Sequence, residues 1–265
     1  MKDGFIRVAA ATPDIHVADP QYNSEQIIEL MEQGSTRGVK VMAFPELCLT
    51  AYTCSDLFLQ ESLLREAKKE LKRILQASKS KDMILFVGMP WMHKGKLYNV
   101  AAVLNRGRIL GIVPKKHLPN YSEFYELRHF NPGMEKVEMT DWEGVQVPMG
   151  MNLLFACRTM PELVLAAELC EDVWVPCPPS ISHALAGATV IANCSASDET
   201  TGKDQYRYNL ICGQSARLVC GYIYANAGEG ESSQDLVFGG QNIIAENGTC
   251  LVQSDRFKNA CICAG

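Results

Sequence analysis

The sequence predicts an α/β fold in which mixed sheets are covered by helices. Apolar runs of strand length alternate with amphipathic segments in the first third of the chain. Further along, short strand-like runs flank Gly-containing turns, which is typical of hairpins. Of the 265 residues, 47 % are hydrophobic, which is enough to bury a large core. Because an all-parallel sheet has no hairpins, we expect parallel and antiparallel strands together.

The first part of the chain alternates between strand-like and helix-like segments. Ser24 is a candidate N-cap, because its hydroxyl can accept a hydrogen bond from a backbone N–H at a helix start. An apolar stripe with helical spacing runs from Leu59 to Leu75 and indicates one long amphipathic helix. We therefore expect strands at residues 5–11, 39–44 and 82–89, and helices at residues 24–34 and 56–79.

Hairpins follow, and the turn at residues 105–107 (Asn-Arg-Gly) is the clearest signal. No internal repeat or linker divides the chain, so we expect residues 1–265 to form a single domain. The final ACICAG ends within a strand-like pattern, so we expect a fragment of a longer protein. The remaining expected elements are strand pairs 97–104 with 108–113 and 151–157 with 163–169, a loop-rich segment 123–140, a short helix near 183–186, a strand at 189–194, a helix at 205–219, a strand at 222–227 and a hairpin of 243–244 with 250–253.

Charge and hydropathy exclude several classes of function. The net charge of −5 gives no electrostatic reason to expect a nucleic acid or an anionic membrane as partner. Arg7 interrupts the apolar run near the N-terminus, which is too short for a secretion signal. No stretch approaches the roughly 18 apolar residues of a membrane span. We expect a cytoplasmic protein.

The eleven cysteines do not form a framework. Their number is odd, their spacing is irregular, and several lie within apolar segments. Disulfide scaffolds belong to small secreted chains, and structural zinc sites use paired Cys-x-x-Cys motifs, which this sequence lacks. We expect no metal, and we expect most of these thiols to behave as small core hydrophobes.

Cys170 differs from the other cysteines because it ends an apolar run and is followed by two acids, Glu171 and Asp172. A cysteine reacts as the thiolate, so a base and a group that stabilises an oxyanion are needed nearby. Glu46 and Lys115 each follow an apolar strand and are candidates for these two roles.

Simpler interpretations of the same residues stay open at this point. Glu46 is also consistent with an ordinary loop glutamate, and Lys115 and Lys116 with solvated lysines. His117 or His183 would instead form a Cys–His dyad with Cys170.

Taken together, these features resemble the nitrilase (carbon–nitrogen hydrolase) superfamily, whose members carry a Glu–Lys–Cys triad at strand ends. Within it, the sequence is most similar to the N-terminal glutaminase domains of glutamine-dependent NAD synthetases. The likeness covers nearly the whole chain. It is carried by the segments RVAAATPDIHVADPQYN, FPELCLTAYTCSDLF, PKKHLPNYSEFYELRHF, ELCEDVW and NCSASDETTGK.

The resemblance implies a four-layer α-β-β-α sandwich and a role for each matching residue. Glu46 would be the general base, Lys115 would stabilise the oxyanion, and Cys170 would attack the side-chain amide of L-glutamine. Lys116 does not hold the motif position. The backbone amide of Glu171 would complete the oxyanion site and Glu126 would orient Lys115. The residues that would line the glutamine pocket are Tyr121, Trp174, Ser197 and Lys203.

The resemblance also implies partners. The glutaminase reaction would need no cofactor, whereas ATP and Mg would belong to a C-terminal NAD synthetase domain. The Ser-Gly-Gly-rich loop of that domain is absent from this sequence. A homo-oligomer is implied as well. Two alternatives are a stand-alone aliphatic amidase or carbamoylase, and a poorly active domain that serves as an assembly surface.

Overall fold

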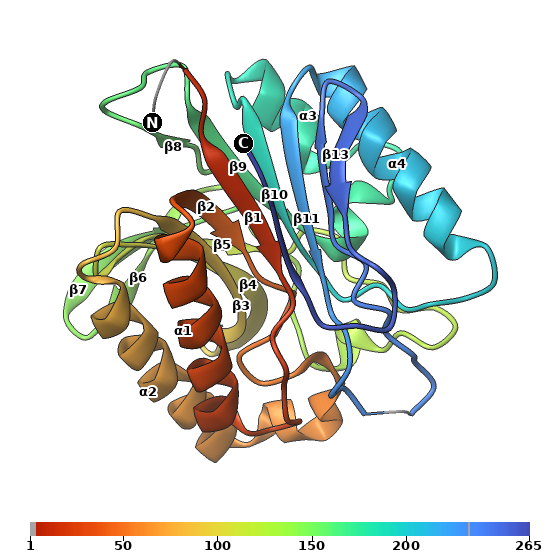
Figure 1. Cartoon of the computed structure of the whole chain (residues 1–265). Helices are drawn as coiled ribbons and strands as arrows, with labels where there is room; N and C mark the ends of the chain where they lie inside the picture. The colour runs from red at the N-terminus through yellow and green to blue at the C-terminus, as the bar shows by residue number, and fades with distance from the viewer. Residues whose placement is uncertain (1–3, 233) are drawn as a thin grey trace.

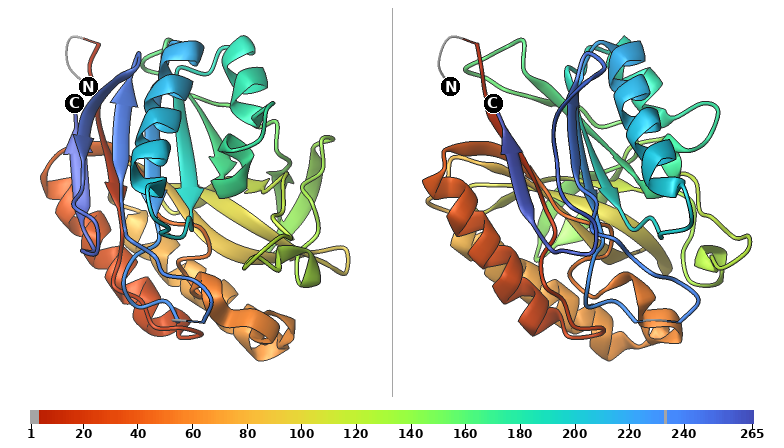
Figure 2. Two further views of the ribbon diagram at one scale, coloured as in Figure 1. Left: turned by 90° about the vertical axis from the view of Figure 1, so that its right-hand side faces the viewer. Right: turned by 45° about the vertical axis from the view of Figure 1, so that its right-hand side comes forward.

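Two β-sheets face each other, and helices cover both outer faces, in a computed structural model that describes residues 4–232 and 234–265 (Figures 1 and 2). The expected four-layer α-β-β-α sandwich with mixed sheets is confirmed. The helices of the first half, which cover the first sheet, are α1 (Pro20–Thr36) and α2 (Glu61–Ser78). Those that cover the second sheet are α3 (Pro179–Leu185) and α4 (Lys203–Leu218).

The first sheet has eight strands in the order β14-β1-β2-β3-β4-β5-β7-β6. Strands β1, β2 and β3 run parallel to one another, β14 pairs with β1 in the antiparallel direction, and β3, β4 and β5 form an antiparallel meander. The bounds of its strands are β1 (Arg7–Ala11), β2 (Val39–Ala43), β3 (Ile84–His93), β4 (Lys96–Asn105), β5 (Arg108–Pro114), β6 (Glu138–Trp142), β7 (Val145–Met149) and β14 (Cys261–Ala264).

The second sheet has six strands in the order β13-β12-β11-β10-β9-β8. Its centre is parallel, since β10 pairs with β9 on one side and with β11 on the other in the same direction. The bounds of its strands are β8 (Phe155–Ala156), β9 (Val164–Leu169), β10 (Val190–Ser195), β11 (Gly221–Asn226), β12 (Ile243–Glu246) and β13 (Thr249–Gln253).

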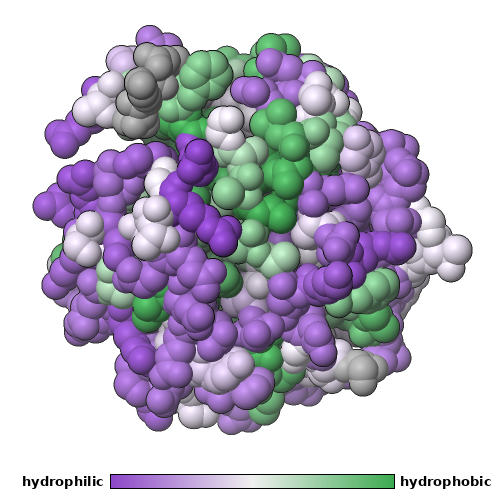
Figure 3. All heavy atoms as spheres, viewed as in Figure 1, coloured by the Kyte–Doolittle hydropathy of each residue, from purple (hydrophilic) through white to green (hydrophobic). Residues whose placement is uncertain are grey.

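The layer between the sheets is rich in alanine. Small side chains let two sheets approach closely while still excluding water. The first sheet contributes Ala10, Ala43 and Ala101, and the second contributes Ala167, Ala192 and Ala225, each at most 1 % exposed. Separate apolar clusters attach α1 and α2 to the first sheet and α4 to the second. On the face drawn in Figure 3, the helices α1 and α2 carry mostly hydrophilic residues, and apolar residues gather in the upper middle where strands reach the surface.

Several expected elements are confirmed, and others were wrong in detail. The hairpin of β4 and β5 and the closing hairpin of β12 and β13 are as predicted. The long helix does not begin at Asp56, because the 3₁₀ segment η1 (Tyr52–Leu59) precedes it and α2 starts at Glu61. Leu59 is accordingly 61 % exposed instead of part of the apolar stripe.

Two further corrections concern the start of α1 and the segment before β9. Asp19, not Ser24, caps α1, since its carboxylate accepts from the backbone N–H of Tyr22. Ser24 is buried in the second turn, where its hydroxyl donates to Glu70. Only residues 155–156 of the expected strand 151–157 pair with β9, and the hairpin of β6 and β7 was not predicted.

No helix in residues 4–232 and 234–265 combines the length and the apolar character that a membrane crossing requires.

Gly88, in β3, packs against the backbone of the loop after β2. A Cβ at Gly88 would meet the carbonyl oxygen of Pro45 at 2.2 Å and the nitrogen of Leu47 at 2.4 Å. We expect Gly88→Ala to lower the free energy of unfolding by about 1–3 kcal/mol, because backbone atoms on both sides must move. Urea titration measures this quantity.

Gly213 provides the matched control for that substitution. It lies exposed in α4, and a Cβ there would meet nothing within 4 Å. Gly213→Ala should raise the free energy of unfolding by up to about 1 kcal/mol, because alanine is the better helix former. Equal effects of the two substitutions would contradict the predicted contact.

Candidate active site

The ends of three strands bring Glu46, Lys115 and Cys170 into one buried cluster. Glu46 follows β2 after two residues, and Lys115 and Cys170 come directly after β5 and β9. The side chains of Glu46 and Lys115 are 0 % exposed, and Cys170 is 5 % exposed. Because β2 and β5 belong to the first sheet and β9 to the second, the cluster joins the two sheets.

Lys115 lies between two carboxylates. Its Nζ donates to Oε1 of Glu46 and to Oε1 of Glu126, each at 2.6 Å. Burial by itself would lower the pKa of the Lys115 ammonium, but the carboxylates of Glu126 and Glu46 outweigh it and raise that pKa well above its ordinary value. Lys115 therefore stays positively charged.

Glu46 is held from both sheets. Asn99 on β4 donates to its Oε1 at 2.6 Å, and the backbone N–H of Ala196, directly after β10, donates to its Oε2 at 3.1 Å. The backbone N–H of Glu46 in turn donates to the carbonyl of Ser195 at 3.3 Å. These contacts fix the carboxylate beside the end of β9 and leave it no freedom to turn toward solvent.

Cys170 adopts a left-handed backbone conformation with φ of 42° at the start of the 3₁₀ helix η3 (Cys170–Val173). This conformation is strained for a residue with a Cβ and is common at functional sites. Burial raises the pKa of the Cys170 thiol, the charge of Glu46 raises it further, and Lys115 offsets only part of the increase. The resting thiol therefore keeps its proton, and reaction requires a base.

Glu126, in η2 (Glu126–Arg128), is a second buried carboxylate. Its Oε1 accepts hydrogen bonds from Lys115 and from the hydroxyl of Tyr52 at 2.8 Å, while its buried Oε2 has no protein partner. Burial raises the pKa of this carboxyl from 4.5 to about 7, against the opposing effect of Lys115. Glu126 thus changes its charge near neutral pH, next to the lysine that it contacts.

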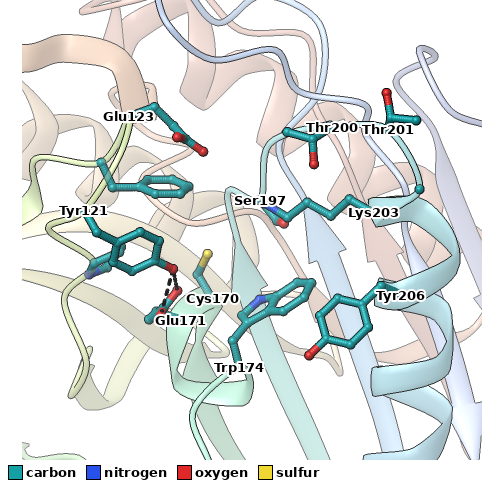
Figure 4. Close-up of a pocket in the computed structure, with 13 residues that line it drawn as sticks. Tyr121, Glu123, Cys170, Glu171, Trp174, Ser197, Thr200, Thr201, Lys203 and Tyr206 are labelled. Carbon is teal, nitrogen blue, oxygen red and sulfur yellow. Dashed lines mark hydrogen bonds between the residues drawn. The ribbon is translucent and has the colours of Figure 1, made fainter.

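A cavity of about 410 Å³ opens above the thiol (Figure 4). Cys170 lines this cavity, whereas Glu46, Lys115 and Glu126 do not, so the thiol connects the cavity with the buried charged cluster. Glu126 contacts Lys115, as expected from the resemblance, and is not part of this cavity. Of the nine residues expected from the sequence, six line it: Tyr121, Cys170, Glu171, Trp174, Ser197 and Lys203.

The cavity carries opposite charges on its two sides. The hydroxyl of Tyr121 donates to both carboxylate oxygens of Glu171 at 3.1 Å, and Figure 4 shows this pair opposite Lys203. The ammonium of Lys203 pairs with Asp198 and lies 5.5 Å from the centre of the Trp174 ring. Such an arrangement suits a small ligand that carries both an ammonium and a carboxylate group.

The geometry favours Glu46 over either histidine as the base for Cys170. The charge of Glu46 acts on the thiol of Cys170. The buried Nε2 of His117 has no hydrogen-bond partner among the described residues. The ring of His183 is hydrogen-bonded to the carbonyl of Met151 at 2.9 Å. Lys116 is partly exposed and lies 3.6 Å from Glu135, as expected of a solvated lysine.

Sequence reasoning missed several residues that position the cluster. Asp172 accepts hydrogen bonds from the backbone N–H groups of Leu169 and His117, and so ties the loop after Lys115 to the end of β9. Burial raises the pKa of Asp172 to about 7. Asn99 and Tyr52 were missed because a polar residue within an apolar strand or loop gives no local sign of its distant partner.

Comparison with known proteins identifies the family. Residues 7–264 match the sequence profile of the carbon–nitrogen hydrolases. The chain belongs to the carbon–nitrogen hydrolase family. Within residues 4–232 and 234–265, this carbon–nitrogen hydrolase shows no group of three or more His, Cys, Asp or Glu side chains arranged to hold a metal ion.

Proteins with similar sequences are larger. The glutamine-dependent NAD(+) synthetase of Mycobacterium tuberculosis is 43 % identical over 254 residues, which are 96 % of this chain and 37 % of that protein. The glutamine-dependent NAD(+) synthetase of Saccharomyces cerevisiae is 30 % identical over 96 % of this chain and 36 % of its own length. The chain therefore spans less than two fifths of either relative.

Solved structures of related proteins superpose on this chain. A glutamine-dependent NAD(+) synthetase from Cytophaga hutchinsonii superposes with a TM-score of 0.88 at 29 % identity, over 98 % of this chain and 42 % of that one. An amidase of the nitrilase superfamily from Nesterenkonia superposes with a TM-score of 0.77 at 19 % identity, over 97 % of this chain and 89 % of that one. The second likeness concerns the fold alone.

The raised pKa of Glu126 predicts a pH dependence of stability. Because its pKa is higher in the folded state (about 7) than the ordinary 4.5, folding binds a proton between these values. The stabilising contribution is complete below pH 4.5 and is lost as the pH rises through 7. The unfolding free energy should therefore fall across this window, by at most about 1.4 kcal/mol per pH unit for this group.

Urea titrations at several pH values between 5 and 8 measure this loss. Glu126→Gln removes the titrating group, so its unfolding free energy should fall less steeply than that of the wild type. Asp172 titrates in the same range and remains in both proteins, so the difference between them isolates Glu126. Parallel curves for the two proteins would contradict the raised pKa.

Proposed function

We propose that this chain is the glutaminase part of a glutamine-dependent NAD synthetase. In this proposal it hydrolyses L-glutamine to glutamate and ammonia through a cysteinyl thioester. The observation that carries the proposal is the buried cluster of Glu46, Lys115 and Cys170, of which Cys170 lines a cavity with charged sides. The similarity to the glutamine-dependent NAD(+) synthetase of Mycobacterium tuberculosis, at 43 % identity, supports the choice of glutamine.

The first half-reaction forms the thioester. Glu46 takes the proton of Cys170 while the sulfur attacks the carbon of the glutamine side-chain amide. The negative charge that develops on the amide oxygen is stabilised by the ammonium of Lys115 and the backbone N–H of Glu171. When the intermediate collapses, the C–N bond breaks, Glu46 returns its proton to the leaving nitrogen, and ammonia departs.

The second half-reaction releases glutamate. Glu46 takes a proton from a water molecule, which attacks the thioester carbon. The same two donors stabilise the second oxyanion, the C–S bond breaks, and the proton on Glu46 returns to the sulfur of Cys170. The cycle is balanced in atoms and charge with the side chains of this chain alone.

The charged sides of the cavity provide a means of recognising glutamine. We place its α-ammonium group at Glu171 and Tyr121 and its α-carboxylate at Lys203 and Ser197. The ring of Trp174 would then cover the aliphatic part of the substrate. Because Lys203 already pairs with Asp198, the substrate carboxylate would share this lysine.

The ammonia would serve a synthetase domain that this chain does not include. In the proposal, that C-terminal domain binds ATP and Mg and amidates nicotinic acid adenine dinucleotide. The glutaminase reaction itself uses no cofactor. The cytoplasmic location and the homo-oligomer remain predictions from the sequence.

A stand-alone aliphatic amidase is the second candidate, because the fold is shared with the Nesterenkonia amidase. The opposite charges of Glu171 and Lys203 favour an amino-acid amide over an aliphatic one. A panel of glutamine, asparagine, propionamide and N-carbamoyl amino acids separates the two candidates. Hydrolysis of propionamide in preference to glutamine would overturn the proposed function.

Cys170→Ala should abolish the release of ammonia from glutamine while leaving the unfolding transition in place. Labelling tests the same assignment: a diazo-ketone analogue of glutamine should add once, to Cys170, and excess glutamine should prevent it. Intact mass and peptide mapping distinguish this thiol from the other ten. Retained activity in Cys170→Ala would exclude the proposed nucleophile.

Lys115→Ala should lower the rate of glutamine hydrolysis by about 100-fold or more, as the loss of an oxyanion donor does. The neighbouring Lys116→Ala is the matched control and should keep the wild-type rate, since its side chain faces solvent. Steady-state ammonia release measures both variants. Similar rates for the two would show that Lys115 does not act on the reaction.

A further inference from the structure

A chain of buried side chains ends on the backbone of the nucleophile. The N–H of Cys170 donates to Oδ1 of Asn193 at 3.1 Å, and Nδ2 of Asn193 donates to the hydroxyl of Tyr222 at 3.0 Å. This hydroxyl donates to Oε1 of Glu168 at 2.5 Å, and Oε2 of Glu168 accepts from the N–H of Ser180 at 2.9 Å. Glu168 is 1 % exposed, and Asn193, Tyr222 and Ser180 are 0 % exposed.

Backbone groups fix the order of donors and acceptors from both ends. A backbone N–H can only donate, so the N–H of Cys170 must face the oxygen of the Asn193 amide. The NH₂ of Asn193 therefore faces the oxygen of Tyr222, whose hydrogen is free for Glu168. At the other end, the N–H of Ser180 requires an acceptor, which Glu168 provides. Only one orientation of the Asn193 amide satisfies every member of the chain.

Cys170 needs such support because of its backbone. Its φ of 42° is strained for a residue with a Cβ, and its N–H is buried. Loss of the acceptor would leave a buried donor unpaired, which is itself unfavourable. Both effects would turn the backbone of Cys170 out of the left-handed conformation.

The position of the sulfur and of the oxyanion donor depends on this turn. Ser195, two residues after Asn193 on β10, contacts the thiol of Cys170, and its hydroxyl donates to Tyr224 at 2.8 Å. Strand β10 thus holds the nucleophile both by its backbone and by its sulfur. The backbone N–H of Glu171 follows Cys170 directly. Rotation of the backbone at Cys170 would therefore displace both the attacking sulfur and this oxyanion donor.

We propose that Asn193 is a positioning residue for Cys170, and that Tyr222 and Glu168 act through Asn193 by fixing the orientation of its amide. The inference deepens the proposed function and uses it for one of its two assays. It assigns to β10 and β11 a role in the reaction rate that is separate from substrate binding.

A double-mutant cycle on glutamine hydrolysis tests this order of action. Asn193→Ala should lower kcat by about 10- to 100-fold, the size expected for leaving a buried donor unpaired. Tyr222→Phe should lower kcat by a smaller factor, because the NH₂ group of Asn193 then loses the acceptor that helps to hold its amide in place. KM should change less than about threefold in both, since neither residue lines the cavity.

The double variant distinguishes a relay from two independent effects. If Tyr222 acts through Asn193, the double variant should have the kcat of Asn193→Ala alone. If the two factors by which the single substitutions lower kcat multiply in the double variant, the relay is overturned. An unchanged kcat in Asn193→Ala would overturn the positioning role. Should Asn193→Ala not fold, Tyr222→Phe still decides: an unchanged kcat there overturns the inference.

Two matched controls separate positioning from a general loss of stability. Asn23 is equally buried and makes three hydrogen bonds to the backbone of His16 and Leu49, away from the cavity. Tyr98 is a buried tyrosine on β4. Asn23→Ala and Tyr98→Phe should keep the wild-type kcat, even where Asn23→Ala lowers the unfolding temperature as much as Asn193→Ala does.

A second assay does not depend on the substrate. Alkylation of Cys170 by iodoacetamide, followed by peptide mapping over a range of pH, reports the ionisation of this thiol. The groups that act on it are Glu46, Lys115, Glu126 and Ser195, with Tyr52, Tyr121 and Tyr224 nearby, and burial raises its pKa most. Release of the backbone in Asn193→Ala should move the thiol outward and lower the midpoint of alkylation. An unchanged midpoint would overturn the inference.

The two assays together distinguish a failure of the proposed function from a failure of the positioning role. A wild-type protein that hydrolyses no glutamine, but whose alkylation midpoint falls in Asn193→Ala and not in Asn23→Ala, would overturn the proposed function and support the positioning role. A wild-type protein that hydrolyses glutamine, with Asn193→Ala unchanged in both kcat and midpoint, would support the proposed function and overturn the positioning role.

Discussion

The ammonium group of Lys115, held between the carboxylates of Glu46 and Glu126, is the interaction on which the site depends. Burying one charge is costly unless a partner compensates it, and this cluster buries three ionisable groups in one place. The positive charge of Lys115 compensates the buried carboxylates, and the raised pKa of Glu126 allows that carboxyl to become neutral by binding a proton. If the end of β2 or of β5 were displaced, the buried charge of Glu46 or of Lys115 would lose its partner.

The same cluster explains why Cys170 rests as a thiol. A buried sulfur beside carboxylates does not ionise by itself, so the proposed reaction needs Glu46 to take the proton of the thiol when the substrate is bound. Ten other cysteines share the chain, and none of them lines this cavity. In the proposed reaction, selectivity among the eleven thiols would therefore come from the position of Cys170 and from the adjacent Glu46, and not from a permanently ionised sulfur.

How far the sequence predicts this structure depends on the range of the interactions involved. The β4–β5 hairpin and the strand ends that carry Glu46, Lys115 and Cys170 follow local patterns, and they were predicted correctly. The break before α2 was missed, because the helical spacing of apolar residues continues across Leu59 although the α-helix begins only at Glu61. The roles of Asn193 and Asp172 were missed as well, since each depends on a partner far away in the sequence or on a backbone turn that no residue type announces.

The alanine-rich layer between the sheets has a mechanical consequence for the chemistry. Glu46 follows a strand of the first sheet and Cys170 a strand of the second, so in the proposed reaction the proton crosses the interface between the two sheets, whose spacing depends on this layer. Proton transfer depends steeply on this spacing, whereas the folded state tolerates small changes in it. Substitutions that enlarge these alanines would therefore alter the proposed reaction before they alter the fold.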